Sequence, residues 1–272
     1  MGCKAQVGPL TCEVTMISSR IHHLYTLRGA YFRDSLRAVG KLGDLMIRVG
    51  FHEELQAAEG DLLRQGTIVR SQIEKVLKAL DTRDVVLAQD VIAGDDKVDD
   101  VYLQTQGRIL NLLALQAPVA GDLRLVSAIL HSNVHVERMG DLCVNIAKFV
   151  LNRMPYPHDS PMVNRLNEMG TRATEMLEIS MSAFAQRSDD LAEQLPIKDE
   201  AIDRLNRGML EDLKNFVNDD ESFEWASNLI LVARYLERFG DHAVDNGEQI
   251  SFLVTGVFRE FTDASHPEEQ RL

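Results

Sequence analysis

Apolar residues recur at helical spacing along most of the chain from about residue 52. Steps of three, four and seven positions place seven of them on one face of a first helix, which ends near residue 80. No stretch of useful length alternates with period two, so the pattern predicts helices and no sheet. The apolar residues of this first face are Leu55, Leu62, Val69, Ile73, Val76, Leu77 and Leu80.

Two further helices are predicted before the middle of the chain, over about 84–114 and from Pro118 to about 152. Asp84 offers N-cap chemistry for the second helix. Pro118 suits the first turn of the third helix, because that position needs no amide hydrogen bond. The predicted inward positions are Val91, Val98, Tyr102, Ile109, Leu112 and Leu113 on the second helix, and Leu123, Val126, Ile129, Leu130, Val134 and Val144 on the third.

A linker separates this set of helices from a second set. Residues 155–161 hold three prolines, which cannot continue a helix. The helical pattern then returns over about 161–186, 189–217 and 221–256. Asp219, Asp220 and Ser222 supply capping chemistry for the last of these helices.

Short motifs show that the second set of helices is a copy of the first. The segment VERMGD at 136–141 returns as LERFGD at 236–241, an offset of 100. At an offset of 104, DDKVD at 95–99 returns as DEAID at 199–203, and GTIV at 66–69 returns as GTRA at 170–173. Three matches in one order indicate an internal duplication. We therefore predict an all-α fold of two tandem antiparallel three-helix bundles related by this duplication.

The duplication also sets the expected domain limits. The two repeats are predicted at 46–154 and 161–257, followed by a polar tail at 258–272. Residues 1–45 lack sustained periodicity, so we expect an extension outside the repeat, either disordered or a mis-assigned start. A helical arm is the alternative for this segment.

Composition narrows the choice of partners. The net charge of −13 argues against nucleic acid and against unaided docking to an anionic membrane, and it suits cations or basic protein surfaces. Cys3, Cys12 and Cys143 lack metal-ligand spacing and suggest a reducing compartment. No apolar run approaches the length of a membrane-spanning helix, so we expect a cytoplasmic protein.

The candidate chemistry lies in acidic pairs spaced i, i+4, which share one face of a helix. Each repeat carries one such pair on its second helix and one on its third, so four carboxylates would converge where these helices pack. Their repulsion would become attraction around a hard cation, which prefers carboxylate oxygens. Other acidic pairs with this spacing occur in the chain, so a solvated acidic face remains the alternative. The predicted metal ligands are Asp95, Asp99, Glu137 and Asp141 in the first repeat, and Asp199, Asp203, Glu237 and Asp241 in the second.

Neighbouring residues complete this prediction. Gly140 and Gly240 are poor helix formers at one motif position, which indicates close approach of another helix beside the site. Arg138 and Arg238 are expected to pair with carboxylates elsewhere in their own bundle.

The histidine spacing and the catalytic motifs that we sought do not support a di-iron site or an enzyme. No histidine has a glutamate three residues before it, which counts against a ferritin-like di-iron site. His242, beside Asp241, could assist a metal or cap a partner carboxylate, and we favour the cap. His135 lies two residues before Glu137, about 200° round the helix, so we do not expect these two side chains to bind one ion. The chain holds no nucleophile elbow, Walker loop or dinucleotide fingerprint, and Cys143 is expected to be a small buried residue, so we predict no enzyme.

The motifs taken together closely resemble those of the PhoU family. They are FHEEL at 51–55, LLALQAPVAGDLR at 112–124 and the two Glu-Arg-x-Gly-Asp motifs, and the resemblance runs from about 46 to about 257. It implies a cytoplasmic, non-enzymatic regulator of phosphate homeostasis built from two three-helix bundles. Such proteins negatively regulate the high-affinity phosphate ABC transporter and phosphate-starvation signalling.

The resemblance also implies partners and a cofactor. The partners are the ATPase subunit of the phosphate ABC transporter, the phosphate-sensing histidine kinase, and a second copy of the chain in a homodimer. The cofactor is a set of metal ions (iron, zinc, manganese and magnesium are the candidates) bound at Asp/Glu-x-x-x-Asp motifs, which here are the eight residues named above. A metal-dependent enzyme or a metal store using the same carboxylates is the alternative.

This chain departs from the family pattern at two positions of the first repeat. His135 stands where an acidic residue is common, and Leu142 stands where histidine is common. The second repeat keeps Asp241 and His242 but has Tyr235 and Asp245 where Asp or Asn is expected.

Overall fold

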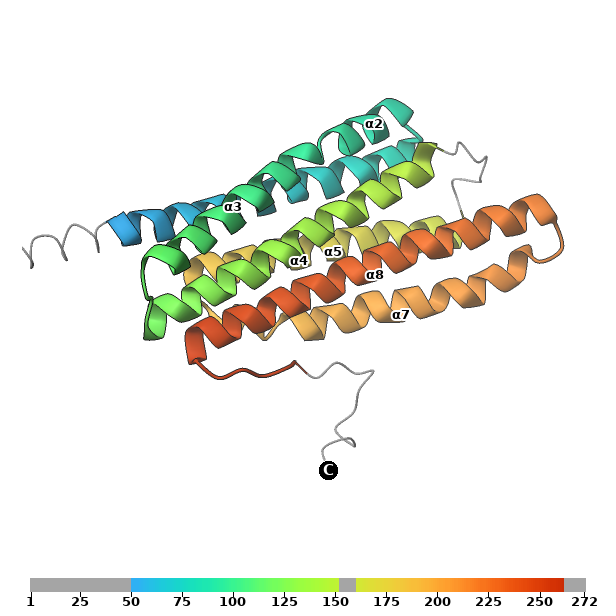
Figure 1. Ribbon diagram of the computed structural model, residues 1–272. Helices are drawn as coiled ribbons and strands as arrows, with labels where there is room; N and C mark the ends of the chain where they lie inside the picture. The colour runs from blue at the N-terminus through green and yellow to red at the C-terminus, as the bar shows by residue number, and fades with distance from the viewer. Residues whose placement is uncertain (1–49, 152–159, 262–272) are drawn as a thin grey trace, which may run out of the picture. The chain divides into compact units, whose positions relative to one another are not determined.

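The computed structural model describes residues 50–151 and 160–261, and every regular element in these ranges is helical (Figure 1). The chain divides into two compact units, Met1–Glu53 and Glu54–Leu272, and the second holds nearly all of the described residues. The predicted extension at 1–45 and most of the tail lie outside the described residues. The elements are a first helix over residues 50–82, α2 Val85–Ala93, α3 Asp96–Leu115, α4 Ala120–Leu151, α5 Pro161–Gln186, α6 Asp189–Ala192, α7 Leu195–Leu213, a 3₁₀ turn Lys214–Phe216, and α8 Asp220–Thr255.

The helices start where the sequence places capping residues. The Asp84 carboxylate accepts hydrogen bonds from the amides of Val86 and Leu87 at the start of α2. The Asp219 carboxylate accepts one from the Ser222 amide at the start of α8. These bonds satisfy amides that have no partner within the helix, so the predicted helix starts are confirmed at both places.

The second helix of each repeat is interrupted, which the apolar pattern did not predict. The first repeat breaks between α2 and α3 at Gly94, a residue that weakens a helix because it has no side chain. The second repeat breaks between α6 and α7 just before Pro196, which cannot donate the amide hydrogen bond that a continuous helix requires. The third helix also starts later than predicted, at Ala120, whose φ of 48° turns the chain into α4.

Several predicted inward residues face solvent instead. Leu113, Leu123 and Val134 are 38%, 48% and 37% exposed. On α4, Ser132 and Asn133 are buried beside the exposed Val134. The buried arc of α4 is wide because this helix packs against α2 and α3 of its own repeat and also against α8 of the other. An apolar side chain alone therefore did not identify the inward face.

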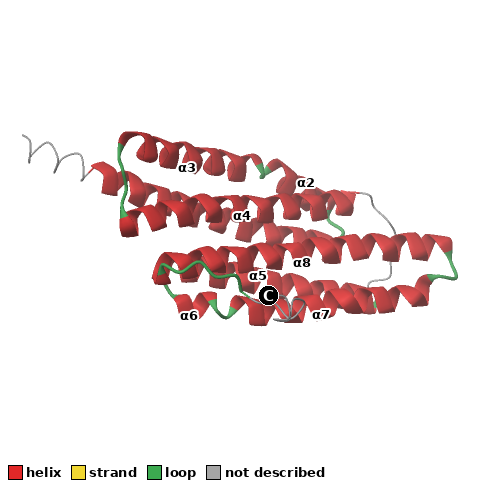
Figure 2. Cartoon of the chain, turned by 60° about the horizontal axis from the view of Figure 1, so that its bottom comes forward, coloured by secondary structure: helices red, strands yellow, loops and turns green. Residues whose placement is uncertain are grey.

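The two bundles meet along two helix pairs. In both views α4 lies beside α8 (Figures 1 and 2). The first helix lies against α5, where Leu77 packs onto Gly170 and Met181 packs onto Gly66. These two contacts are equivalent under the repeat offset of 104, so the duplicated sequence makes the same contact twice across the interface.

None of the described helices has both the length and the apolar character needed to cross a membrane.

Candidate metal sites

The first acidic quartet lies where α3 packs against α4. Asp95 directly precedes α3 and Asp99 lies in its first turn, while Glu137 and Asp141 lie on α4. A Cβ atom at Gly140 would lie 3.5 Å from Asp95 Oδ1. Gln72 Oε1 and Val98 Cγ1 would lie closer still, at 3.3 Å, so this glycine allows neighbouring helices to approach α4 closely, as its motif position indicated.

The pKa shifts show that these four carboxylates act on one another. Burial raises the pKa of Asp95, a hydrogen bond from Gln72 Nε2 (3.3 Å) opposes this, and Asp99 and Asp141 add to it. Burial also raises the pKa of Glu137, followed by the charge of Asp141, with smaller contributions from Asp99 and Asp95. The structure therefore places the four predicted residues of the first repeat on α3 and α4 near enough for their charges to interact.

The second quartet repeats this arrangement where α7 packs against α8. Asp199 and Asp203 lie on α7, and Glu237 and Asp241 lie on α8. A Cβ atom at Gly240 would lie 2.5 Å from Asp199 Oδ1, well inside van der Waals contact. Asp199 is accordingly buried against the backbone of α8.

Burial is deeper in the second quartet. Glu237 is 8% exposed, and burial raises its pKa to about 7, with Asp241 and Asp203 also raising it and Arg234 and Arg238 opposing. The pKa of Asp241 is raised by burial first, with Arg234 opposing and Asp203 adding. Protons thus compete with any cation for the Glu237 carboxylate near neutral pH.

Arginines reach into both quartets. Arg138 Nη1 donates to Asp141 Oδ2 at 2.9 Å, and Arg138 Nε lies 3.5 Å from Glu137 Oε2. The expectation that Arg138 pairs elsewhere in its bundle was wrong, because a long side chain on a helix reaches the residue three positions on. In the second repeat Arg234 pairs with Glu237 Oε1, and Arg207 Nη1 lies 3.7 Å from Asp203 Oδ2. In both quartets the carboxylates outnumber these arginines, which leaves an excess of negative charge.

A third group of ligand atoms lies between the bundles, where sequence reasoning placed none. His135 on α4 faces His242 and Asp245 on α8. Within residues 50–151 and 160–261, these are the only three His, Cys, Asp or Glu side chains whose ligand atoms all lie within 4.8 Å of one another. In the same ranges, no three ligand atoms of an acidic quartet lie within 4.8 Å of one another. The histidines come from different repeats, so no local spacing could have paired them.

Cys143 takes no part in these groups. It is fully buried, and burial followed by the charge of Asp95 raises the pKa of its thiol. The prediction of a small buried residue is confirmed.

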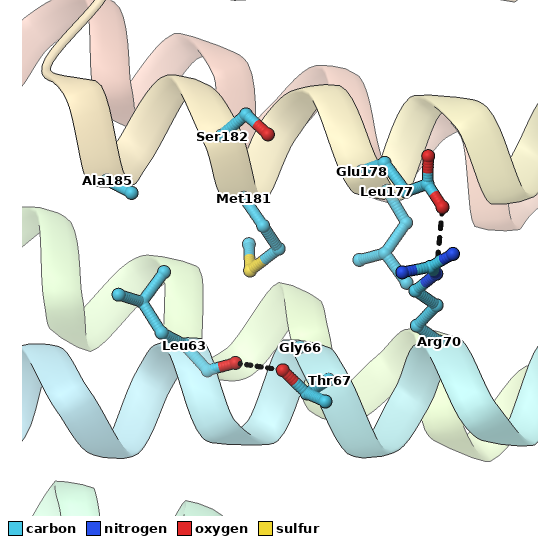
Figure 3. Close-up of a pocket in the computed structure, with 9 residues that line it drawn as sticks. All are labelled: Leu63, Gly66, Thr67, Arg70, Leu177, Glu178, Met181, Ser182 and Ala185. Carbon is cyan, nitrogen blue, oxygen red and sulfur yellow. Dashed lines mark hydrogen bonds and ion pairs between the residues drawn. The ribbon is translucent and has the colours of Figure 1, made fainter.

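A cavity of about 380 Å³ opens between the first helix and α5, on the other helix pair of the interface (Figure 3). Arg70 crosses one end of it to Glu178, with Nε and Oε1 2.8 Å apart. None of the eight predicted ligands lines this cavity. Its lining is Leu63, Gly66, Thr67, Arg70, Leu177, Glu178, Met181, Ser182 and Ala185.

Comparison with known proteins matches both repeats to one family. The model of the PhoU domain matches residues 62–150 and 166–250. A relative from Clostridium acetobutylicum is 30% identical over 213 residues, covering 78% of this chain and 97% of its own. One from Aquifex aeolicus is 33% identical over 187 residues, covering 68% and 84%. Both are named phosphate-specific transport system accessory protein PhoU homolog.

Two crystal structures have the same fold. PhoU from Pseudomonas aeruginosa has a TM-score of 0.70 and 29% identity, covering 76% of this chain and 100% of its own. The phosphate transport system regulatory protein PhoU from Streptococcus pneumoniae has a TM-score of 0.70 and 29% identity, covering 78% and 100%.

Proposed function

The chain belongs to the PhoU family, and from this premise we propose that it is an accessory regulator of phosphate-specific transport. The observation that carries the proposal is the match of one family domain to both repeats, together with relatives named as accessory proteins of that system. The family and the helical fold predicted from the sequence are both confirmed. A role associated with phosphate transport follows from this membership.

The regulator is not an enzyme. Its relatives are named as accessory and regulatory proteins, which confirms the prediction made from the missing catalytic motifs. The alternative of a metal-dependent enzyme is therefore set aside.

The regulator acts as a negative regulator through protein contacts in the cytoplasm. Its partners are the ATPase subunit of the phosphate ABC transporter, the phosphate-sensing histidine kinase, and a second copy of itself. The net charge of −13 favours basic partner surfaces, and the exposed Leu103 and Leu110, seven residues apart on α3, offer an apolar patch for protein contact.

Metal at the two acidic quartets tunes this regulator. The chemistry fits, because the buried Glu237 Oε2 atom accepts no hydrogen bond from the described residues, and its neighbours Asp203 and Asp241 repel its charge. A divalent cation would bind the unpaired oxygen and would reduce the repulsion between the carboxylates. Each quartet supplies oxygen ligands alone, which suits magnesium, manganese or ferrous iron. The holding residues are Asp95, Asp99, Glu137 and Asp141 in one repeat and Asp199, Asp203, Glu237 and Asp241 in the other.

Deletion of the gene in its own host tests the regulatory role. At high phosphate we expect the deletion strain to show high phosphate uptake and high alkaline phosphatase activity, because the restraint on transporter and kinase is gone. Reintroducing the wild-type gene should restore repression. Normal repression in the deletion strain, with no second copy of the gene present, would contradict the proposal.

Elemental analysis tests the metal sites in protein purified without a nickel step. We expect Asp203→Asn with Glu237→Gln to remove the metal of the second repeat and to leave that of the first. Asp99→Asn with Glu137→Gln should do the reverse, since each pair belongs to one quartet. Asp190→Asn, at an exposed position outside both quartets, is the matched control. Unchanged metal content in both double variants would refute binding at the quartets.

A further inference from the structure

His135, His242 and Asp245 form a compact triangle between the two repeats. His135 Nδ1 lies 3.4 Å from His242 Nδ1 and 3.5 Å from Asp245 Oδ2, and His242 Nδ1 lies 3.5 Å from the same oxygen. We infer that this triangle is a binding site for a borderline transition-metal ion such as Zn²⁺, distinct from the all-oxygen quartets, and that the ion joins α4 to α8.

The dimensions of the triangle match those of a tetrahedral zinc site. Zinc binds imidazole nitrogen at about 2.0–2.1 Å and carboxylate oxygen at about 2.0–2.2 Å. Two ligand atoms of a regular tetrahedron lie about 1.6 bond lengths apart, so their separation is about 3.3–3.4 Å. The three observed separations are within about 0.2 Å of this value, so an ion would enter with little rearrangement of the side chains.

The ligand set also has the right chemistry. Two imidazoles and one carboxylate favour zinc, copper or nickel over magnesium or calcium. Without an ion, two nitrogens at this distance can share only one proton. An ion would satisfy all three ligand atoms at once.

The site has a path to solvent and room for a fourth ligand. The side chains of His135 and His242 are 20% and 18% exposed, and that of Asp245 is 45% exposed. Water can therefore complete the coordination.

Within the described part of the chain the site has no copy in the other repeat, unlike the quartets. At the repeat offset of 100, the counterparts of its three residues are Tyr235, Leu142 and Asn145, which cannot bind zinc as a set. The duplicated fold thus carries one asymmetric site where its two halves meet. Because the ligands come from both repeats, a bound ion would stabilise the packing of one bundle on the other.

Titration of metal-free protein with Zn²⁺ and Co²⁺ tests the site. For the wild type we expect one tight equivalent of zinc and a Co²⁺ complex with visible absorption bands typical of nitrogen ligation. His135→Gln and His242→Gln should each weaken this equivalent by at least about 10- to 100-fold, the loss seen even for second-layer partners of metal ligands. His52→Gln, a histidine outside the cluster, is the matched control and should bind as the wild type does.

Two further variants keep the test decisive. Asp245→Asn changes a half-exposed residue to the amide found at its repeat counterpart, so it should fold normally and still bind zinc more weakly. Asp99→Asn with Asp203→Asn changes both quartets and should leave the tight equivalent in place. Wild-type protein without a tight zinc equivalent, or unchanged affinity in His135→Gln and Asp245→Asn, would overturn the inference. Neither result bears on phosphate regulation, which the deletion strain tests separately.

Discussion

Glu237→Gln is expected to raise the free energy of unfolding by about 2–3 kcal/mol at pH 8 in the absence of divalent cations. Burial and the neighbouring Asp241 and Asp203 carboxylates raise the pKa of Glu237 to about 7 in the folded protein, whereas an unfolded glutamate ionises near about pH 4.3. Ionising this side chain in the folded state therefore costs about 3–4 kcal/mol. Glu237→Gln also removes the ion pair between Glu237 and the half-exposed Arg234, but such a pair contributes little to the free energy of unfolding.

The sign of the pH dependence follows from the same shift. Between about pH 4.5 and pH 7 the folded protein holds the Glu237 proton and the unfolded chain releases it. The contribution of this group to the free energy of unfolding therefore falls as the pH rises through that window, and the whole cost is present above pH 7. Urea unfolding at several pH values in the presence of EDTA should show a fall in the wild type that is smaller in Glu237→Gln.

A control variant and an added divalent cation test whether the stability change comes from the buried charge of Glu237. Glu224→Gln changes an exposed glutamate on the same helix and should unfold as the wild type does. If the second quartet binds a divalent cation, adding the cation at pH 8 should stabilise the wild type but not Glu237→Gln. Parallel pH profiles for the wild type and Glu237→Gln would show that the buried charge carries no such cost.

Gly170→Val is expected to lower the free energy of unfolding by about 1–3 kcal/mol, the usual cost of overpacking. A Cβ atom at Gly170 would overlap the Leu77 side chain, because α5 and the first helix approach each other closely at this point. Valine adds two further methyl groups at the same contact, so Leu77 or the helices themselves must shift. Chemical denaturation of both proteins measures the difference.

The matched control is Gly107→Val on α3, where no atom lies within 4 Å of a built Cβ. It should leave stability nearly unchanged, since valine is at least as good a helix former as glycine. Leu77→Ala should recover part of the loss in the Gly170→Val background, because it removes the overlapping side chain. Equal effects at Gly170 and Gly107, or no coupling to Leu77, would show that the contact does not hold the two bundles together.

The sequence by itself determined the features that depend on local spacing. Helix starts at Asp84 and Asp219 were predictable because a capping side chain bonds to amides two or three residues away. Convergence of the quartets was predictable too, since residues four apart share a helix face and neighbouring helices of a bundle pack side by side. Because of the duplication, the acidic pairs occupy equivalent positions in both repeats.

Only the tertiary structure decided which groups from different repeats meet. The exposure of Val134 depends on how α4 packs against its neighbours, and apolar identity alone did not show this. The pairing of His135 with His242 depends on the way α4 lies along α8, across 107 residues of chain. Likewise the high pKa of Glu237 is a product of burial. Local spacing contains no information about contacts between distant helices, because these are set by the summed packing of whole helix faces.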